Sequence, residues 1–162
     1  ARMAANSQLP GQRTALAPLI QGLVRVLERV HYDKNISIHT AFGIDVEWVA
    51  AEEQDVQEML GNLLDNACKW AASRVTVSAR PAPPTAGRGL LVIAVEDDGP
   101  GLPPEQRAQA LKRGQRLDET KPGSGLGLAI VRETAAMYNG EVRLDEASLG
   151  GLRASLTLGS AS

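Results

Sequence analysis

The sequence Asn-Leu-Leu-Asp-Asn-Ala-Cys-Lys at residues 62–69 belongs to a longer segment in which apolar residues recur at helical spacing. This spacing predicts an amphipathic helix that begins near Glu53 and packs on a sheet. At about 100° per residue, Asn62, Asn66 and Lys69 lie within roughly 60° of one another on its surface. They form a polar stripe beside the apolar arc, which consists of Val56, Met59, Leu60, Leu63, Leu64, Ala67 and Cys68.

Before this helix, the sequence predicts another helix and two strands. Apolar residues recur at helical spacing from Leu16, and the pattern ends near Tyr32. Residues 36–38 and 46–49 then alternate in the manner of strands. The turn at residues 42–43 between them predicts that these two strands form a hairpin.

After the helix, the sequence predicts four strands. Residues 75–79 alternate between apolar and polar, whereas residues 90–96 are nearly all apolar. A continuous apolar strand is typical of the centre of a sheet, so we expect residues 90–96 to be central. Residues 141–144 and 153–158 predict a second hairpin at the end of the chain.

The last predicted helix completes the pattern. It runs from about Gly125 to Tyr138 and ends in a cap formed by Asn139 and Gly140. The polar, proline-containing residues 102–122 before it predict a mobile loop with at most a short helix. The order of elements predicts an α/β fold, a two-layer sandwich of a mixed sheet with three main helices on one face.

Length and composition predict one globular domain. The chain has 162 residues, and we expect residues 14–160 to form the domain and residues 1–13 to be a tail or the remnant of a linker. Its 17 Lys and Arg against 19 Asp and Glu give no reason to expect binding to nucleic acid. No apolar run approaches the roughly 20 residues of a membrane span. The single cysteine, Cys68, lies in the predicted apolar arc, which favours a packing role.

The polar stripe on the central helix suits a metal ion and an anion. Mg²⁺ prefers oxygen ligands and keeps several waters, so one Asn carbonyl together with phosphate oxygens can hold it. Asn62 and Asn66 are poor residues for a helix interior, and their place at the border of the core favours a functional role. Asn66 is our candidate metal ligand. Lys69, one turn later, can reach a phosphate, although a solvated lysine explains it equally well.

The sequence Asp-Asp-Gly-Pro-Gly at residues 97–101 follows the predicted central strand. Such residues ordinarily form a turn. However, Asp97 emerges from a buried strand, where a carboxylate must accept a hydrogen bond from a ligand or a water. The exocyclic amine of adenine is a suitable donor.

A glycine-rich segment precedes the last helix. It superficially resembles a dinucleotide-binding fingerprint, but that fingerprint follows a strand, and here a polar loop precedes it. The remaining interpretation is a glycine-rich approach to a helix N-terminus, where free N–H groups and the helix dipole attract phosphate. Arg113, Arg116 and Lys121 in the loop can close over that phosphate. The segment comprises Gly123, Ser124, Gly125, Leu126 and Gly127.

Together, the three segments resemble the N, G1 and G2 boxes of the ATP-binding domain of bacterial sensor histidine kinases, within the superfamily of gyrase, Hsp90 and MutL. The resemblance covers roughly residues 20–160. It is strongest to PhoQ-type sensor kinases, which share the patterns at residues 65–69, 95–101 and 113–116. It implies a Bergerat-type fold that binds ATP and Mg²⁺.

The resemblance also implies a role for individual residues. Asn66 would bind Mg²⁺, Asp97 would accept the adenine amine, and Trp70 would border the base. Lys69, Arg116 and Lys121 would contact the phosphates beneath a flexible lid. The other implied nucleotide contacts are Gly99, Gly101, Gly123, Ser124, Gly125, Leu126 and Gly127.

Asn62 lies one turn before the candidate metal ligand, where hydrolytic relatives carry a glutamate that activates water. Asparagine cannot act as that base. The resemblance therefore implies a protein kinase in which Asn62, Lys69 and Arg116 are the catalytic residues, because phosphoryl transfer depends mainly on positioning and charge stabilisation. An ATP hydrolase of the same superfamily and a non-catalytic nucleotide-binding or docking module are the alternatives.

Two departures from the family pattern bear on this interpretation. Leu111 stands where the family has the aromatic residue of its F box, which affects how the lid packs. His31 and His39 do not fit the pattern of a phosphoacceptor helix, so we expect both to be structural or surface residues.

The accepting histidine would lie on a separate dimerisation domain, and the phosphate would pass to a response regulator. We expect a monomeric fragment of a homodimeric protein, and a cytoplasmic domain of an inner-membrane sensor.

Overall fold

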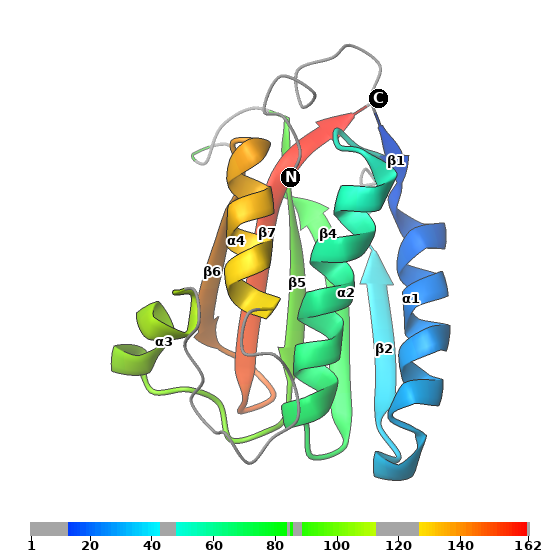
Figure 1. Ribbon diagram of the computed structural model, residues 1–162, viewed down its shortest axis with the longest axis vertical. Helices are drawn as coiled ribbons and strands as arrows, with labels where there is room; N and C mark the ends of the chain where they lie inside the picture. Colours follow the sequence, from blue (N-terminus) through cyan, green and yellow to red (C-terminus); the bar gives the residue numbers. More distant parts are fainter. Residues whose placement is uncertain (1–12, 43–47, 84, 86–88, 113–126, 162) are drawn as a thin grey trace.

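A computed structural model describes residues 13–42, 48–83, 85, 89–112 and 127–161. Figure 1 shows two layers, with three long helices side by side over one face of a mixed sheet. The predicted fold class is therefore confirmed. The helices are α1 (Leu16–Val30), η2 (Tyr32–Lys34), α2 (Glu53–Trp70), α3 (Pro104–Ala110) and α4 (Gly127–Met137). The strands are β1 (Thr14–Ala15), β2 (Ser37–Phe42), β3 (Trp48–Val49), β4 (Arg74–Pro81), β5 (Leu90–Asp97), β6 (Glu141–Glu146) and β7 (Leu152–Ala161).

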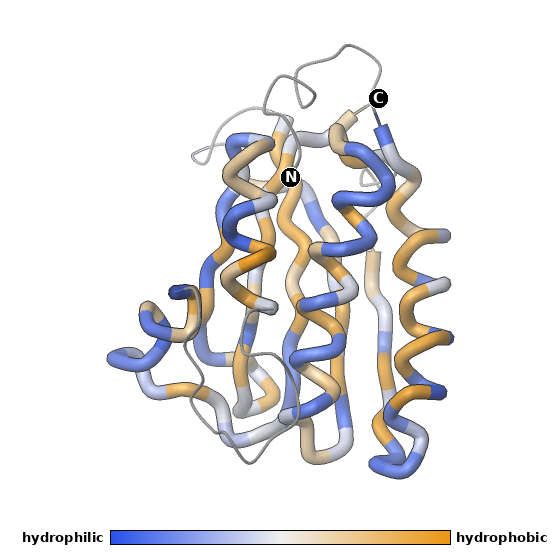
Figure 2. Tube along the Cα trace, in the orientation of Figure 1, coloured by the Kyte–Doolittle hydropathy of each residue, from blue (hydrophilic) through white to orange (hydrophobic). Residues whose placement is uncertain are grey.

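Helix α2 packs its predicted apolar arc into the core. All seven predicted members are buried, together with Asp55 in the first turn. Glu53 and Asp55 near the N-terminus and Lys69 in the last turn complement the helix dipole. Figure 2 shows the resulting alternation of apolar and polar residues along the helices, in front of the largely apolar β5.

The sheet has the strand order β1-β3-β7-β5-β4-β2, and β6 pairs with β7. Strand β5 lies between β4 and β7, antiparallel to both, so its predicted central place is confirmed. The predicted hairpin at the end of the chain is also confirmed, as β6 and β7. Because β5 is buried over most of its length, its last residue, Asp97, leaves the strand from within the core.

The predicted hairpin of residues 36–38 and 46–49 is wrong. Strand β2 pairs in parallel with β4, whereas β3 pairs with β1 and β7 towards the opposite side of the sheet. Alternating polarity identifies a strand but not its partner. Here the partly buried Ile38 and Phe42 pack against the core beside α1, which places β2 next to β4 instead of β3.

A tyrosine joins the N-terminal end of α2 to the C-terminal end of α4. Tyr138, just after α4, donates a hydrogen bond to the buried carboxylate of Asp55 and accepts one from the backbone N–H of Glu52 at 3.3 Å. Burial and the bond to Asp55 raise the pKa of Tyr138 to about 12. The predicted cap follows at once, since Asn139 adopts a left-handed conformation and Gly140 N–H bonds to the Ala135 carbonyl at 2.8 Å.

Candidate functional site

Three segments far apart in the sequence meet at one end of the molecule. The end of α2, the end of β5 and the start of α4 all lie at the lower end in Figure 1. A Cβ atom built on Gly99 would lie only 2.2 Å from the backbone oxygen of Trp70. A Cβ atom built on Gly127 would lie 3.8 Å from the side-chain oxygen of Asn62. Helix α2 therefore lies next to both the residues that follow β5 and the start of α4.

The carboxylate of Asp97 is buried, with 2% of the residue exposed. Its Oδ1 accepts hydrogen bonds from the backbone N–H of Gly99 at 2.9 Å and of Leu152 at 3.3 Å. Burial raises the pKa of Asp97, and these two N–H groups offset only part of that effect. Within the described part of the chain, Oδ2 has no hydrogen-bond partner, so it can accept a donor from a ligand.

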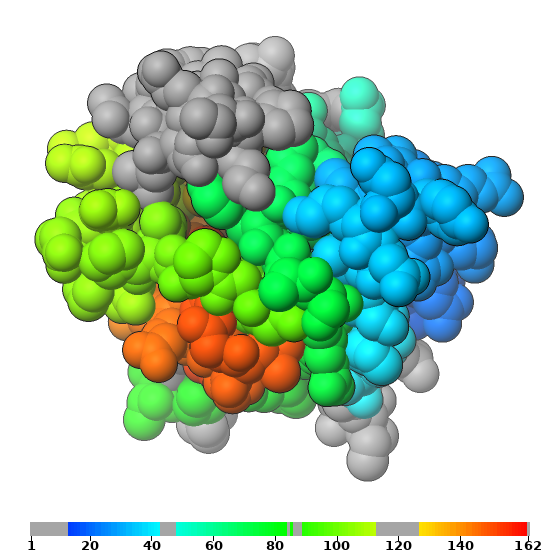
Figure 3. Space-filling model, turned by 90° about the horizontal axis from the view of Figure 1, so that it is seen from below, coloured from blue at the N-terminus to red at the C-terminus, as the bar shows by residue number. Residues whose placement is uncertain are grey.

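The turn between β6 and β7 contributes to this site, which the sequence analysis did not predict. The N–H of Gly151 bonds to the Asp97 carbonyl at 3.2 Å, and the next N–H, from Leu152, reaches the carboxylate. A Cβ atom on Gly151 would lie 2.1 Å from Asp97 Oδ1. In Figure 3 the orange turn lies against the yellow-green residues that follow β5. The sequence signal for this approach is the second glycine of the pair Gly150-Gly151, because the turn itself needs only one.

Asp98, the neighbour of Asp97, has a structural role. Its carboxylate accepts backbone hydrogen bonds from Ala72, Ser73 and Arg74 at 2.9–3.1 Å, and a fourth from the Ser73 hydroxyl at 2.8 Å. Burial acts to raise the pKa of Asp98, but these hydrogen bonds outweigh it and lower the pKa to about 2. Asp98 thereby fastens the segment after α2 to the end of β5.

The polar stripe of α2 lies where it was predicted. Asn62, Asn66, Lys69 and Trp70 are all half-buried, at the border of the core. Lys69 Nζ lies 3.0 Å from Asp65 Oδ2. Among the described residues, no group of three or more His, Cys, Asp or Glu side chains could hold a metal ion. A divalent cation at this stripe would therefore depend on an amide oxygen, water and the ligand's own oxygens.

The start of the predicted lid is anchored to the core. Leu111, which the resemblance assigns to the F-box position, packs against the core just after α3. Its carbonyl accepts a hydrogen bond from Arg132 of α4 at 3.3 Å. The predicted phosphate contacts Arg116, Lys121 and residues 123–126 lie outside the described residues. Gly127 is the first residue of α4.

The fold and the site define an ATP-binding domain of the histidine kinase type. The family model described as "Histidine kinase-, DNA gyrase B-, and HSP90-like ATPase" matches residues 51–161, well over half of the sequence. The chain belongs to this family.

Individual proteins that resemble this chain are sensor proteins or sensor histidine kinases by name. The chain is 42% identical to the two-component sensor PhoQ of Pseudomonas aeruginosa over 146 residues, which cover 90% of this chain and 31% of the relative. It is 37% identical to the sensor protein PhoQ of Escherichia coli K12 over 159 residues, covering 98% and 32%. The solved mycobacterial sensor histidine kinase MprB superposes with a TM-score of 0.77 at 26% identity, covering 91% of this chain and 96% of that one.

The chain spans about a third of the length of these curated relatives. No helix in the described ranges has the length and apolar character that crossing a membrane requires.

Gly151→Ala tests the approach of the β6–β7 turn to Asp97. The new methyl group would collide with the carboxylate, so we expect a loss of about 2–4 kcal/mol in the free energy of unfolding and weaker ATP binding. Urea denaturation and calorimetric titration measure the two effects. Gly159→Ala is the control, because its nearest neighbour would be 3.7 Å away. Equal behaviour of the two variants would contradict the assignment.

Asp98 predicts a pH dependence of stability. Its pKa in the folded protein, about 2, is below the ordinary value of 3.8, so folding favours the ionised form. This contribution is complete above pH 3.8 and is lost as the pH falls towards 2. We expect the difference in unfolding free energy between the parent and Asp98→Asn to shrink over this range.

Denaturant unfolding at several pH values measures this difference. Asp33→Asn, at an exposed position of η2, controls for the loss of one surface carboxyl group. A difference between parent and Asp98→Asn that stays constant down to pH 2 would refute the role of Asp98.

Proposed function

We propose that this chain is the catalytic domain of a two-component sensor histidine kinase. It binds ATP with Mg²⁺ and transfers the γ-phosphate to a histidine on a separate dimerisation domain. The observation that carries the proposal is the buried carboxylate of Asp97, which is held through Oδ1 and has no partner at Oδ2 among the residues that the structure describes. The PhoQ relatives, which are named as sensors, support the signalling role.

Asp97 accounts for recognition of the adenine base. Its Oδ2 accepts the exocyclic amine, a donor that guanine lacks at that position. Trp70 borders the base from the end of α2. Gly99 and Gly101 allow close approach of the backbone of Trp70 and of Gly151, respectively. Gly101 also has a φ of +73°, which residues other than glycine seldom adopt. A buried carboxylate oxygen gives specificity, because a ligand without a hydrogen-bond donor at this position leaves the oxygen unsatisfied.

Asn66 and Lys69 account for recognition of the phosphates. The Asn66 carbonyl would supply one ligand to Mg²⁺, with water and phosphate oxygens as the other ligands. The metal would neutralise part of the charge of the phosphates. Lys69 adds a positive charge one turn later, and the N-terminus of α4 adds N–H groups and a dipole. Arg116, Lys121 and the glycine-rich residues 123–127 are the further phosphate contacts that we propose from the sequence.

Asn62 distinguishes transfer from hydrolysis. Its side chain lies beside the start of α4 and carries no group that can take a proton from water. The γ-phosphate is instead positioned for the accepting imidazole nitrogen. A nitrogen–phosphorus bond forms there, the bond between the γ-phosphorus and the bridging oxygen breaks, and ADP leaves with that electron pair.

The accepting histidine belongs to another domain. His31 forms an ion pair or hydrogen bond with Asp65, and only 11% of its side chain is exposed. His39 lies on the edge strand β2, whereas α4 packs on β6 and β7. We propose that residues 14–160 form the catalytic domain and act on the protein's own dimerisation domain. The full-length protein is then a homodimeric inner-membrane sensor whose cytoplasmic part includes this monomeric domain. Its phosphate passes to a response regulator.

Asp97→Asn tests recognition of adenine. The amide can turn its NH₂ group towards the adenine amine, which leaves two donors facing each other. We expect ATP affinity to fall by about 1–3 kcal/mol with the fold intact, as measured by calorimetry and circular dichroism. Asp145→Asn on β6 is the matched control. Unchanged affinity in Asp97→Asn would show that Asp97 only shapes the turn.

Asn66→Ala tests the metal ligand. We expect the variant to lose the part of the ATP affinity that depends on Mg²⁺, while affinity without the metal stays close to that of the parent. Calorimetric titrations with Mg²⁺ and with a chelator measure both terms. Gln57→Ala, an exposed amide on the same helix, is the control. An equal response of parent and Asn66→Ala to Mg²⁺ would assign the ion to other groups.

A further inference from the structure

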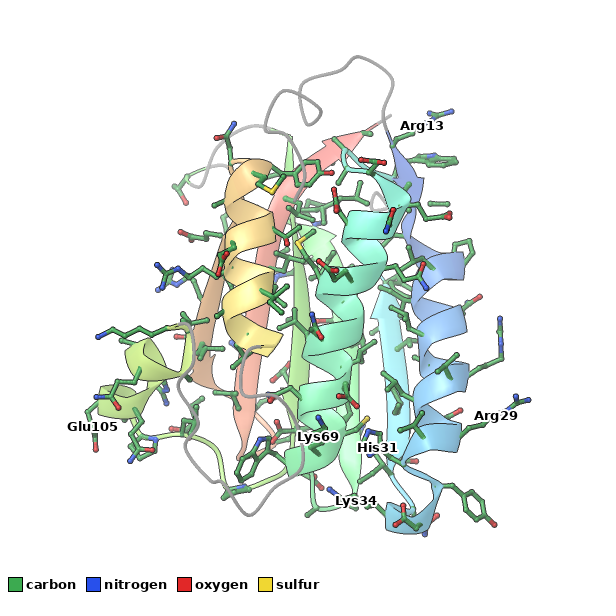
Figure 4. The ribbon with its side chains drawn as sticks, in the orientation of Figure 1. Arg13, Arg29, His31, Lys34, Lys69 and Glu105 are labelled. Carbon is green, nitrogen blue, oxygen red and sulfur yellow. The ribbon has the colours of Figure 1, made fainter. Side chains whose placement is uncertain are left out.

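The turn that follows α1 lies against the end of α2. Residues 31–34, comprising His31 and η2, are separated by about 34 positions in the sequence from the residues that they contact. Figure 4 shows His31, Lys34 and Lys69 close together at the lower end of the molecule, whereas Arg29 points away from them. Two side chains of the turn, His31 and Lys34, reach the last turn of α2 by separate routes.

Lys34 contacts the backbone of α2. Its Nζ donates hydrogen bonds to the carbonyls of Cys68 at 2.8 Å and of Lys69 at 2.6 Å. These carbonyls belong to the last turn of the helix, where no N–H of the helix itself can satisfy them. A positive charge at this end also complements the helix dipole. Lys34 therefore fixes the geometry of the turn that carries Lys69 and Trp70.

His31 contacts a side chain of α2. Its Nε2 lies 2.9 Å from Oδ1 of Asp65, and the other oxygen of that carboxylate lies 3.0 Å from Lys69 Nζ. The exposed fractions of the His31, Asp65 and Lys69 side chains are 11%, 35% and 25%, so all three are partly shielded from water. Holding one oxygen of Asp65 orients the other. His31 thereby determines where the ammonium group of Lys69 lies.

We propose that His31 and Lys34 are positioning residues of the nucleotide site. The proposal rests on the proposed function, because Lys69 and Trp70 are its phosphate and base contacts. Both routes end on the same helical turn, and neither His31 nor Lys34 is among the proposed nucleotide contacts. His31 acts through Asp65 on the phosphate contact, and Lys34 acts through the backbone on both contacts.

The first experiment separates positioning from simple stabilisation. The affinities of the parent and His31→Leu for ATP and for adenosine are measured by titration followed by nuclear magnetic resonance. We expect ATP to bind about 3- to 10-fold more weakly and adenosine to bind unchanged, since only ATP meets Lys69. In a Lys69→Met background, His31→Leu should cause no further loss of ATP affinity. Arg29→Met, on the same segment, is the control for ATP binding.

An equal loss for ATP and adenosine, or a loss that persists with Lys69→Met, would reduce His31 to a structural residue and overturn its part of the proposal. Unchanged ATP binding by His31→Leu would do the same. If the parent itself binds no ATP, the proposed function fails instead.

The second experiment needs no nucleotide. Hydrogen exchange of the backbone amides in residues 68–72 should be faster in Lys34→Met than in the parent, and Lys34→Arg should restore the parent's rate. Amides near the start of α2 serve as the internal reference, which also reveals a variant that unfolds as a whole. Parent-like exchange in Lys34→Met would overturn the role of Lys34.

Discussion

Burial of the Asp97 carboxylate is the constraint on which the arrangement of this site depends. A carboxylate removed from water is costly unless polar groups surround it. Here two backbone N–H groups from different segments, those of Gly99 and Leu152, converge on one oxygen. To bring them there, the turn between β6 and β7 must approach β5 so closely that Gly151 has no space for a side chain.

The neighbouring residues Asp97 and Asp98 have different roles because their surroundings differ. Burial at the end of β5 raises the pKa of Asp97, and the two N–H donors offset only part of that effect. Among the described residues, both donors bond to Oδ1, so Oδ2 stays available. Asp98 points to the segment after α2 and finds four donors, so its pKa falls to about 2 and its bonding capacity is used internally. Asp98 therefore fixes the backbone around the site, and Asp97 is the carboxylate that we propose for ligand recognition.

Local patterns in the sequence predicted those features that depend on one element alone. The apolar arc of α2, the half-buried Asn62 and Asn66 beside it and the central β5 follow from periodicity and composition. The partner of β2 did not follow, because alternating residues identify a face of a strand and not its neighbour. Gly151 and the contacts of His31 and Lys34 with α2 were missed for the same reason, since they join residues that only the tertiary fold brings together.

The joint at Tyr138 has a mechanical consequence. The hydroxyl of Tyr138 joins the N-terminal end of α2 to the C-terminal end of α4. Asn66 and Gly127 lie towards the other ends of these two helices. For two helices joined at one end, a small change of the angle between them becomes a larger change of separation at their opposite ends. Contacts at the opposite end of the molecule therefore constrain the separation of Asn66 and Gly127, beside which we propose that the triphosphate binds.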